Sequence, residues 1–220
     1  NGIPFVAFEP GYGSEEEWDG AEARVADHGE LLELLGRRSG AIRALADEVV
    51  RRADGRGRPL LVGVTGAPGS GKSLVADDLR RVLASLGIDA PLLRLDDYRR
   101  TAPPLPAPLD GDHLGHAFDL VAFDAALAET RAGGGRAAVV EGLFLLDGRV
   151  RPNLDFAIHL EAREEVLLRR LAASRGPEEA RRARDLFLPA HAAFAAGHPP
   201  RRLADLLLET SNPLSPEPLR

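Results

Sequence analysis

The sequence predicts an α/β domain, in which strands and helices alternate along the chain. Short apolar runs rich in Val, Leu and Ile recur over residues 59–209 and are separated by stretches with the 3.6-residue spacing of amphipathic helices. The 220 residues, 44% of them hydrophobic and 28% charged, are enough for one domain with a sizeable core. A glycine-rich loop after the first apolar run adds a third observation, because strand, loop and helix follow one another there.

In this first unit, residues 59–65 are the predicted strand and residues 74–86 the predicted helix. Between them the chain matches the pattern of Gly, any four residues and Gly-Lys-Ser/Thr without a mismatch. The loop and the residue after it are the predicted nucleotide-binding residues: Gly66, Ala67, Pro68, Gly69, Ser70, Gly71, Lys72, Ser73 and Leu74.

Each residue type in this loop suits a bound phosphate. Glycines let successive N–H groups point at one anion, and the following helix presents its positive N-terminus. Lys72 adds a mobile charge, and Ser73 is placed to ligate a magnesium ion that bridges the phosphates. Lys72 is also the only lysine among 28 Lys and Arg residues, which indicates that a compact ammonium is needed here. A chance match in a glycine-rich turn is the alternative interpretation.

Composition argues against several other classes of protein. The net charge of −6 gives no overall basic field to attract nucleic acid, and the absence of cysteine excludes disulfides and cysteine metal sites. No apolar stretch approaches the roughly 20 residues that span a bilayer, and the N-terminus lacks the features of a signal peptide. We therefore expect a cytoplasmic protein with no nucleic-acid or membrane partner. A homodimer is compatible with the sequence, which does not show the oligomeric state.

The patterns divide the chain into three segments. Residues 1–58 are expected to form an arm and helices packed on the core, residues 59–210 the phosphate-loop domain, and residues 211–220 a proline-rich tail. Gly36 and Gly40 are expected to split the helical pattern of the first segment into two helices.

Acidic residues stand where two later strands end. Residues 90–95 form a predicted strand that leads into Asp96 and Asp97, and residues 137–144 form another that contains Glu141. In open parallel sheets, ligands bind beyond the carboxyl ends of the strands, so these carboxylates can face a phosphate on the neighbouring loop. A phosphotransferase needs a base there, and a magnesium-nucleotide site needs an acid. A simple turn is the alternative for the two aspartates.

The other elements follow from the same periodicities. Residues 101–116, rich in proline and glycine, are expected to form an irregular binding loop. The remaining predictions are helices at residues 118–130, 163–174 and 177–194, and strands at residues 154–160 and 203–209.

Four motifs occur in order along the chain: the phosphate loop, Asp96-Asp97-Tyr98, the segment around Glu141 and Gly142, and Pro189-Ala190-His191 followed by Ala204-Asp205. Together they resemble the uridine kinase and phosphoribulokinase family of P-loop kinases over residues 59–210. The resemblance implies a three-layer α/β/α P-loop NTPase fold with a five-stranded parallel sheet, here with an N-terminal helical extension. It also implies transfer of the γ-phosphoryl group of ATP, with Mg²⁺, to a hydroxyl of a small metabolite.

Several site residues are implied by position within this family. Asp96 resembles the general base, Asp97 is an alternative to it, and Tyr98 is expected beside them in the substrate site. Glu141 is similar to the acid that supports Mg²⁺. Asp112 and His113 resemble the start of a family segment whose first aspartate binds a sugar, although Leu114 stands where the family has proline.

Three arginines, Arg169, Arg170 and Arg175, fall where the family has a mobile lid over ATP. Arginines beside a phosphate loop can neutralise the charge that develops on the transferred group. They can equally form the solvated face of a helix, and the sequence leaves both interpretations open.

The acceptor and the outcome of nucleotide binding are also left open. Residues 130–139 are too few for the hairpin that holds the pyrimidine in uridine kinases, so a smaller sugar or a vitamin precursor is expected at least as much as a nucleoside. The rival functions are an ATPase or GTPase switch and a nucleotide-binding protein without catalysis. The chain has no Asn-Lys-x-Asp motif for guanine, and Asp96 and Glu141 argue against a purely binding role.

Overall fold

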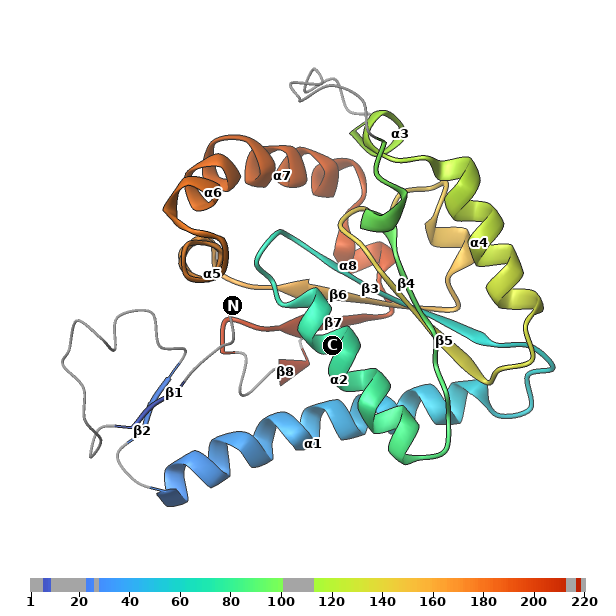
Figure 1. Cartoon of the computed structure of the whole chain (residues 1–220), viewed down its shortest axis with the longest axis horizontal. Helices are drawn as coiled ribbons and strands as arrows, with labels where there is room; N and C mark the ends of the chain where they lie inside the picture. The colour runs from blue at the N-terminus through green and yellow to red at the C-terminus, as the bar shows by residue number, and fades with distance from the viewer. Residues whose placement is uncertain (1–5, 9–22, 26–27, 101–112, 213–216, 219–220) are drawn as a thin grey trace.

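A computed structural model describes residues 6–8, 23–25, 28–100, 113–212 and 217–218. Figure 1 shows a central sheet with helices on both faces and a layered α/β/α arrangement. Within the described helices and strands, side chains are described from residue 39 onward, apart from those of residues 113 and 217.

The central sheet has six strands among the described residues, in the spatial order β4-β5-β3-β6-β7-β8. The first five are parallel, and β8 is antiparallel to β7. The expected fold with its five-stranded parallel sheet is thus confirmed, with an added antiparallel edge strand. Parallel pairing brings the carboxyl ends of five strands to one edge of the sheet. The strands are β3 Leu60–Gly66, β4 Leu92–Arg94, β5 Ala137–Glu141, β6 Phe156–Glu161, β7 Leu206–Glu209 and β8 Glu217–Pro218.

Helices cover both faces of this sheet (Figure 1). They are α1 His28–Ala53, α2 Lys72–Ser85, α3 His113–Ala117, α4 Leu120–Ala132, α5 Glu164–Arg175, α6 Pro177–Arg182, α7 Leu188–Gly197 and α8 Pro200–Leu203. Three shorter turns of other helix types join them: η1 Leu95–Tyr98, η2 Arg151–Asn153 and the π-helical η3 Ala183–Phe187. None of the helices in the described ranges combines the length and the apolar character that crossing a membrane requires.

The core is divided by the sheet into two apolar clusters, because successive strand residues point to opposite faces. Val62 and Val64 of β3 belong to the cluster under α1 and α2. Leu61 of the same strand belongs to the other cluster, together with Phe123 of α4, and Phe194 of α7 packs against that cluster. The three central strands β5, β3 and β6 are nearly all buried, as expected for a parallel sheet that is covered on both faces.

The N-terminal helix corrects one sequence prediction. Helix α1 runs without a break, so the expected division at Gly36 and Gly40 is wrong. A glycine inside a helix costs only about 1 kcal/mol, and the burial of Ile42, Leu45 and Val49 on the sheet offsets that cost. A two-stranded parallel pair, β1 Val6–Phe8 and β2 Ala23–Val25, precedes it and was not expected from the sequence.

Three boundaries also differ from the predictions. Helix α3 begins at His113, inside residues 101–116, which were expected to be irregular throughout. Residue 203 ends α8 rather than opening the last parallel strand, because Pro200 favours the first turn of a helix. Strand β8 lies in the expected tail, where it pairs with the edge of β7 that would otherwise be open.

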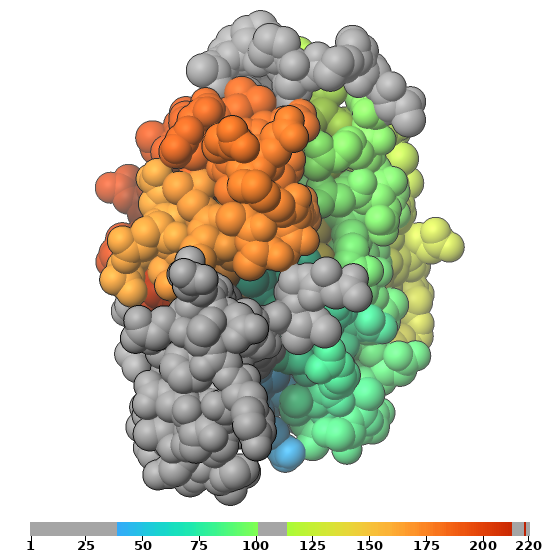
Figure 2. Space-filling model, turned by 60° about the vertical axis from the view of Figure 1, so that its left-hand side comes forward, coloured from blue at the N-terminus to red at the C-terminus, as the bar shows by residue number. Residues whose placement is uncertain are grey.

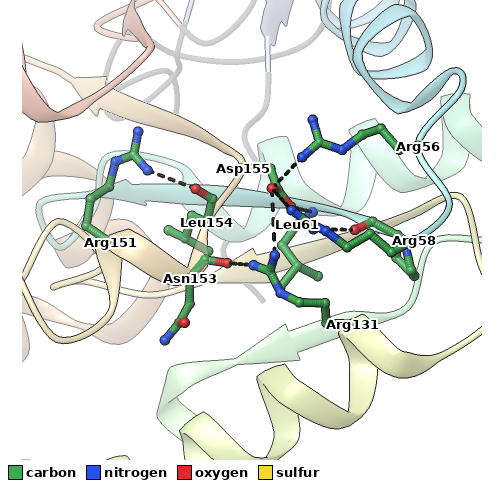
Figure 3. Close-up of polar contacts among 9 residues, drawn as sticks. Arg56, Arg58, Leu61, Arg131, Arg151, Asn153, Leu154 and Asp155 are labelled. Atoms are coloured by element: carbon green, nitrogen blue, oxygen red, sulfur yellow. Dashed lines mark hydrogen bonds and ion pairs between the residues drawn. The ribbon is translucent and has the colours of Figure 1, made fainter.

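Asp155, directly before β6, binds several arginines at the end of the sheet opposite the phosphate loop (Figure 3). Its side chain is 8% exposed and accepts hydrogen bonds from Arg56, from both terminal nitrogens of Arg58 and from the backbone N–H of Leu61, with Arg131 at 3.8 Å. Burial alone would raise the pKa of Asp155, but the hydrogen bonds from Arg58 and Leu61 and the charges of Arg131 and Arg56 bring it below its usual value.

We expect Asp155→Ala to lower the free energy of unfolding by about 2–3 kcal/mol, because it leaves the N–H of Leu61 unpaired and removes the only acid that the described structure places among these three arginines. The arginines are partly exposed and can turn to water, which limits the loss. Urea unfolding followed by circular dichroism measures it. Asp155→Asn keeps an acceptor for Leu61 and should lose less; equal losses would show that the charge contributes nothing.

Candidate active site

The phosphate loop lies at the carboxyl edge of the sheet, between β3 and α2. Gly66 has φ +152°, and a Cβ on it would lie 2.5 Å from the carbonyl oxygen of Leu160 on β6. Only glycine allows this approach of the two strands. The nucleotide-binding residues predicted from the motif, residues 66–74, therefore form the turn from the central strand into a helix N-terminus, where N–H groups can bind phosphate.

Lys72 lies across this loop. Its Nζ donates a hydrogen bond to the carbonyl oxygen of Ala67 at 2.9 Å. Burial lowers the pKa of Lys72 from 10.5 to about 8, while the negative charges of Glu141 and Asp96 raise it and the positive charge of Arg175 lowers it. Glu141 ends β5 and Asp96 follows β4, so both lie at the edge of the sheet that carries the loop. A bound phosphate would add negative charge and raise the pKa again.

Ser73 and Glu141 meet directly. The Ser73 hydroxyl donates to Oε1 of Glu141 at 2.9 Å, and the Glu141 side chain is buried at the end of β5. Arg94 on the neighbouring strand lies with its Nε 3.3 Å from the other oxygen, Oε2, and its Nη2 3.4 Å from Asp77. A hydroxyl and a carboxylate are hard oxygen ligands, which suit Mg²⁺.

These two oxygen donors would supply only part of a magnesium shell. Across the described residues, no three or more His, Cys, Asp or Glu side chains form a group that could hold a metal ion. Mg²⁺ ordinarily takes its remaining ligands from phosphate oxygens and water. The donor set therefore fits an ion that arrives with a nucleotide.

Asp96 and Asp97 lie in η1, directly after β4. The Asp96 side chain is 60% exposed and pairs with Arg99 at 3.0 Å, while its charge acts on Lys72. Asp97 is also exposed. Gly142 explains why η1 lies so close to β5: a Cβ there would come within 2.7 Å of the Leu95 side chain. The structure thus brings the predicted base to the side of the sheet edge where the lysine lies.

Tyr98 and the predicted sugar-binding residues are placed differently. The Tyr98 ring packs edge-on against Phe123, with centroids 5.2 Å apart, and so forms part of the apolar packing of α4. Asp112 lies outside the described residues. His113 begins α3, but its side chain is not among those described.

The three predicted lid arginines occupy three different places on α5. Arg170 donates to the carbonyl oxygens of Gly69, Thr210 and Ser211, and so ties the phosphate loop to the chain after β7. Arg175, at the end of the helix, is the arginine whose charge acts on Lys72. Arg169 is exposed on another side of the helix.

Thr210 completes this anchor and was not predicted from the sequence. It is buried, and its hydroxyl lies 2.9 Å from the carbonyl oxygen of Ser70 and 3.0 Å from that of Glu161, so it can donate to either. Together with Arg170 it fixes the back of the phosphate loop. Only the close approach of segments 140 residues apart in sequence reveals this role, and no local pattern signals it.

A border between two parts of the chain runs past this site. In Figure 2 the orange surface of α6 and α7 meets the green surface of the segment after β4, and teal surface from the region of the phosphate loop and α2 is seen below them. The helices that follow β6 and the segment that carries Asp96 thus face each other beside the loop.

Two histidines near Lys72 had no functional role predicted from the sequence, although His191 stands in one of the four motifs. His159 of β6 and His191 of α7 have nearly parallel rings, with centroids 6.1 Å apart. Burial lowers the pKa of each from 6.5 to about 4, helped for His159 by the charges of His191 and Lys72, and for His191 by that of Lys72. A polar residue inside the apolar run of β6 is the one local signal that could have drawn attention to His159.

We expect the protein to lose stability as the pH falls from 6.5 to 4. In that range the unfolded chain binds protons at His159 and His191 that the folded chain does not, so the free energy of unfolding falls by about 1.4 kcal/mol per pH unit for each histidine. Urea unfolding at pH 7, 6 and 5 measures the slope. His159→Phe should make it shallower, and an unchanged slope would contradict the expectation.

The sheet order and the phosphate loop define the P-loop kinase fold, and solved structures of this class share it. The chain matches a candidate uridine kinase from Bacillus stearothermophilus with a TM-score of 0.57 and 17% identity, covering 76% of this chain and 96% of that one. It matches a candidate fructose transport system kinase from a Silicibacter species with a TM-score of 0.56 and 22% identity, covering 70% and 94%.

A third structure of this fold is D-glycerate 3-kinase from Cryptococcus neoformans, with a TM-score of 0.57 and 13% identity over 81% of this chain and 99% of that one. No protein-family model and no curated protein sequence matches the chain. The chain therefore has the fold of uridine kinase-like P-loop kinases, and its activity has to be inferred from the site.

Proposed function

We propose that the protein is an ATP-dependent kinase that phosphorylates a hydroxyl group of a small metabolite, such as a nucleoside, a sugar or a vitamin-like compound. The observation that carries this proposal is that Asp96, after β4, and Glu141, at the end of β5, lie at the same edge of the sheet as Lys72, where Glu141 accepts a hydrogen bond from the neighbouring Ser73. A lysine that binds phosphate and an exposed carboxylate that can take a proton are the two groups that phosphoryl transfer to an alcohol needs. The fold shared with kinases of a sugar acid and, as candidates, of a nucleoside and a sugar supports it.

In the proposed reaction, Asp96 orients the acceptor hydroxyl and accepts its proton as the oxygen bonds to the γ-phosphorus of ATP. The bond from that phosphorus to the β,γ-bridging oxygen breaks, and ADP leaves with the electron pair. Lys72 and the loop N–H groups stabilise the charge on the phosphate oxygens, and Arg175 is near enough to contribute. Ser73 and Glu141 would hold Mg²⁺, which when bound neutralises charge on the phosphates.

The test is ADP release from Mg-ATP in the presence of nucleosides, sugars, hydroxy acids and pantothenate-like vitamins. Stimulation by one compound, with formation of its phosphate ester, is the expected result. ATP binding with no stimulated turnover across the panel would overturn the kinase proposal and favour a switch or a binding protein. Steady hydrolysis of ATP at a rate that no acceptor changes would indicate an ATPase.

A further inference from the structure

The His159–His191 pair lies on one face of the sheet, next to the strand that leads into the phosphate loop. His159 occupies the register position next to Thr65 on β3, the residue just before Gly66. Successive residues of a strand point to opposite faces of the sheet, so the His159 imidazole lies on the face opposite Ile158 and Leu160. Those two residues pack under α1 and α2. Helix α7 brings His191 over it.

Part of this pair lacks the hydrogen bonds that a buried polar group normally has. His159 is 5% exposed, and its Nδ1 is buried without a hydrogen-bond partner among the described residues. The hydroxyl of the neighbouring Thr65 donates its hydrogen bond to the carbonyl oxygen of Leu143 and not to His159. An unpaired buried nitrogen costs free energy, so its presence beside the strand that leads into the phosphate loop points to a partner that arrives with a ligand.

The charge of the two imidazoles restricts the chemistry of the ligand that they can bind. With pKa values of about 4, both imidazoles are neutral at pH 7. A neutral imidazole offers one N–H donor and one acceptor nitrogen. Such groups match hydroxyls, which also donate and accept at once, and they do not provide the positive charge that a second phosphate would require.

The geometry of the pair also excludes one way of binding an aromatic acceptor. Ring centroids 6.1 Å apart fall within the range of rings in direct contact. No gap remains between them for a nucleobase, so the two histidines cannot clamp an aromatic acceptor by stacking on both of its faces.

We propose that His159 and His191 bind the acceptor of the reaction, and that this acceptor is a small non-aromatic polyol, a sugar or sugar acid with adjacent hydroxyl groups. The inference rests on the proposed kinase function and narrows its substrate class. The imidazole nitrogens hold hydroxyls that are not phosphorylated, while Asp96 on the other side of Lys72 receives the reacting hydroxyl. The pair therefore acts in binding and positioning, and takes no proton in the reaction.

The first test is a kinetic comparison of matched variants of the full chain with Mg-ATP and the best acceptor of the panel. His159→Phe and His191→Phe keep a buried ring but lose the nitrogens, and each should raise KM for the acceptor about tenfold while KM for ATP stays within twofold. His198→Phe is the control: that ring stacks on Phe194 and hydrogen-bonds its carbonyl, away from the pair. Acceptor KM values within twofold of wild type in both test variants would overturn the proposal.

A second measurement separates this proposal from the kinase function and does not depend on variants that fold. Imidazole nitrogen signals of the ¹⁵N-histidine-labelled wild-type protein with an ATP analogue are followed while D-ribose, D-fructose, D-glycerate or uridine is added. A polyol should shift the signals of His159 and His191 and leave that of His198 in place. Such shifts without turnover would refute the kinase and keep the binding site, whereas a lack of shift with every polyol, or a best acceptor that is aromatic, would refute the binding site.

Discussion

Asp96→Asn is expected to lower kcat by about 10²–10⁴-fold and to leave the dissociation constant of ATP within a few-fold of wild type. The amide has the shape of the carboxylate but cannot accept the proton of the acceptor hydroxyl. Asp96 is mostly exposed and pairs with the equally exposed Arg99, so the change strands no buried partner. The loss should therefore appear in turnover rather than in folding or nucleotide binding.

Asp97→Asn provides the matched control, because Asp97 is the exposed neighbour in the same turn. It should keep near-normal turnover. If the effects were reversed, with Asp97→Asn inactive and Asp96→Asn active, the base would be Asp97, which the sequence left open. Normal turnover in both variants would remove η1 from the chemistry altogether.

The parts of the fold that were predicted from the sequence are those with strong local signals. The continuous apolar run before Gly66 and the helical spacing after Ser73 fix β3 and α2 with little error. Glu141 was also predicted, because a strand pattern ending in an acid and a glycine places both at the carboxyl edge. Local patterns suffice there because a parallel sheet sends all its strand ends to the same edge.

What the sequence did not reveal depends on contacts between distant segments. Thr210 and His159 gain their roles from segments that approach only in the folded chain; no local pattern signals Thr210, and the only local signal for His159 is a polar residue within the apolar run of β6. Arg170 illustrates the same limit. A cluster of arginines suggested a lid, but Arg170 donates hydrogen bonds to three backbone carbonyls, one on the loop and two after β7. Arg175 is the arginine of the cluster whose charge acts on Lys72.

Arg170 and Arg175 of the same helix therefore have different roles. The guanidinium of Arg170 supports the phosphate loop from behind, whereas Arg175 ends a helix next to a glycine with φ +92° at residue 176. A left-handed glycine between α5 and α6 is a place where the chain can turn sharply. The proposed catalytic contribution therefore belongs to Arg175, and the contribution of Arg170 is to the shape of the loop.

Replacement of Lys72 should reduce activity about as strongly as replacement of Asp96. Lys72→Ala is expected to lower kcat/KM by on the order of 10³-fold, because it removes a positive charge from both the bound phosphates and the transition state. The dissociation constant of Mg-ATP measures the loss of phosphate binding, and turnover with the best acceptor measures the loss of transition-state stabilisation. A variant that binds ATP normally and keeps more than a tenth of wild-type turnover would contradict the assignment of the loop.

The same residue gives a test that needs no substitution. Since the chain has a single lysine, labelling with ¹⁵N-lysine gives one Nζ signal, which reports Lys72 directly. It should titrate near pH 8 in the free protein and at higher pH with a bound ATP analogue, because the phosphates favour the charged form. The dissociation constant of ATP should accordingly rise above pH 8, by up to about tenfold per pH unit until the pKa of the complex is reached. Lys72→Arg keeps its charge over this range and should show a constant affinity; a parallel rise in that variant would assign the pH dependence to another group.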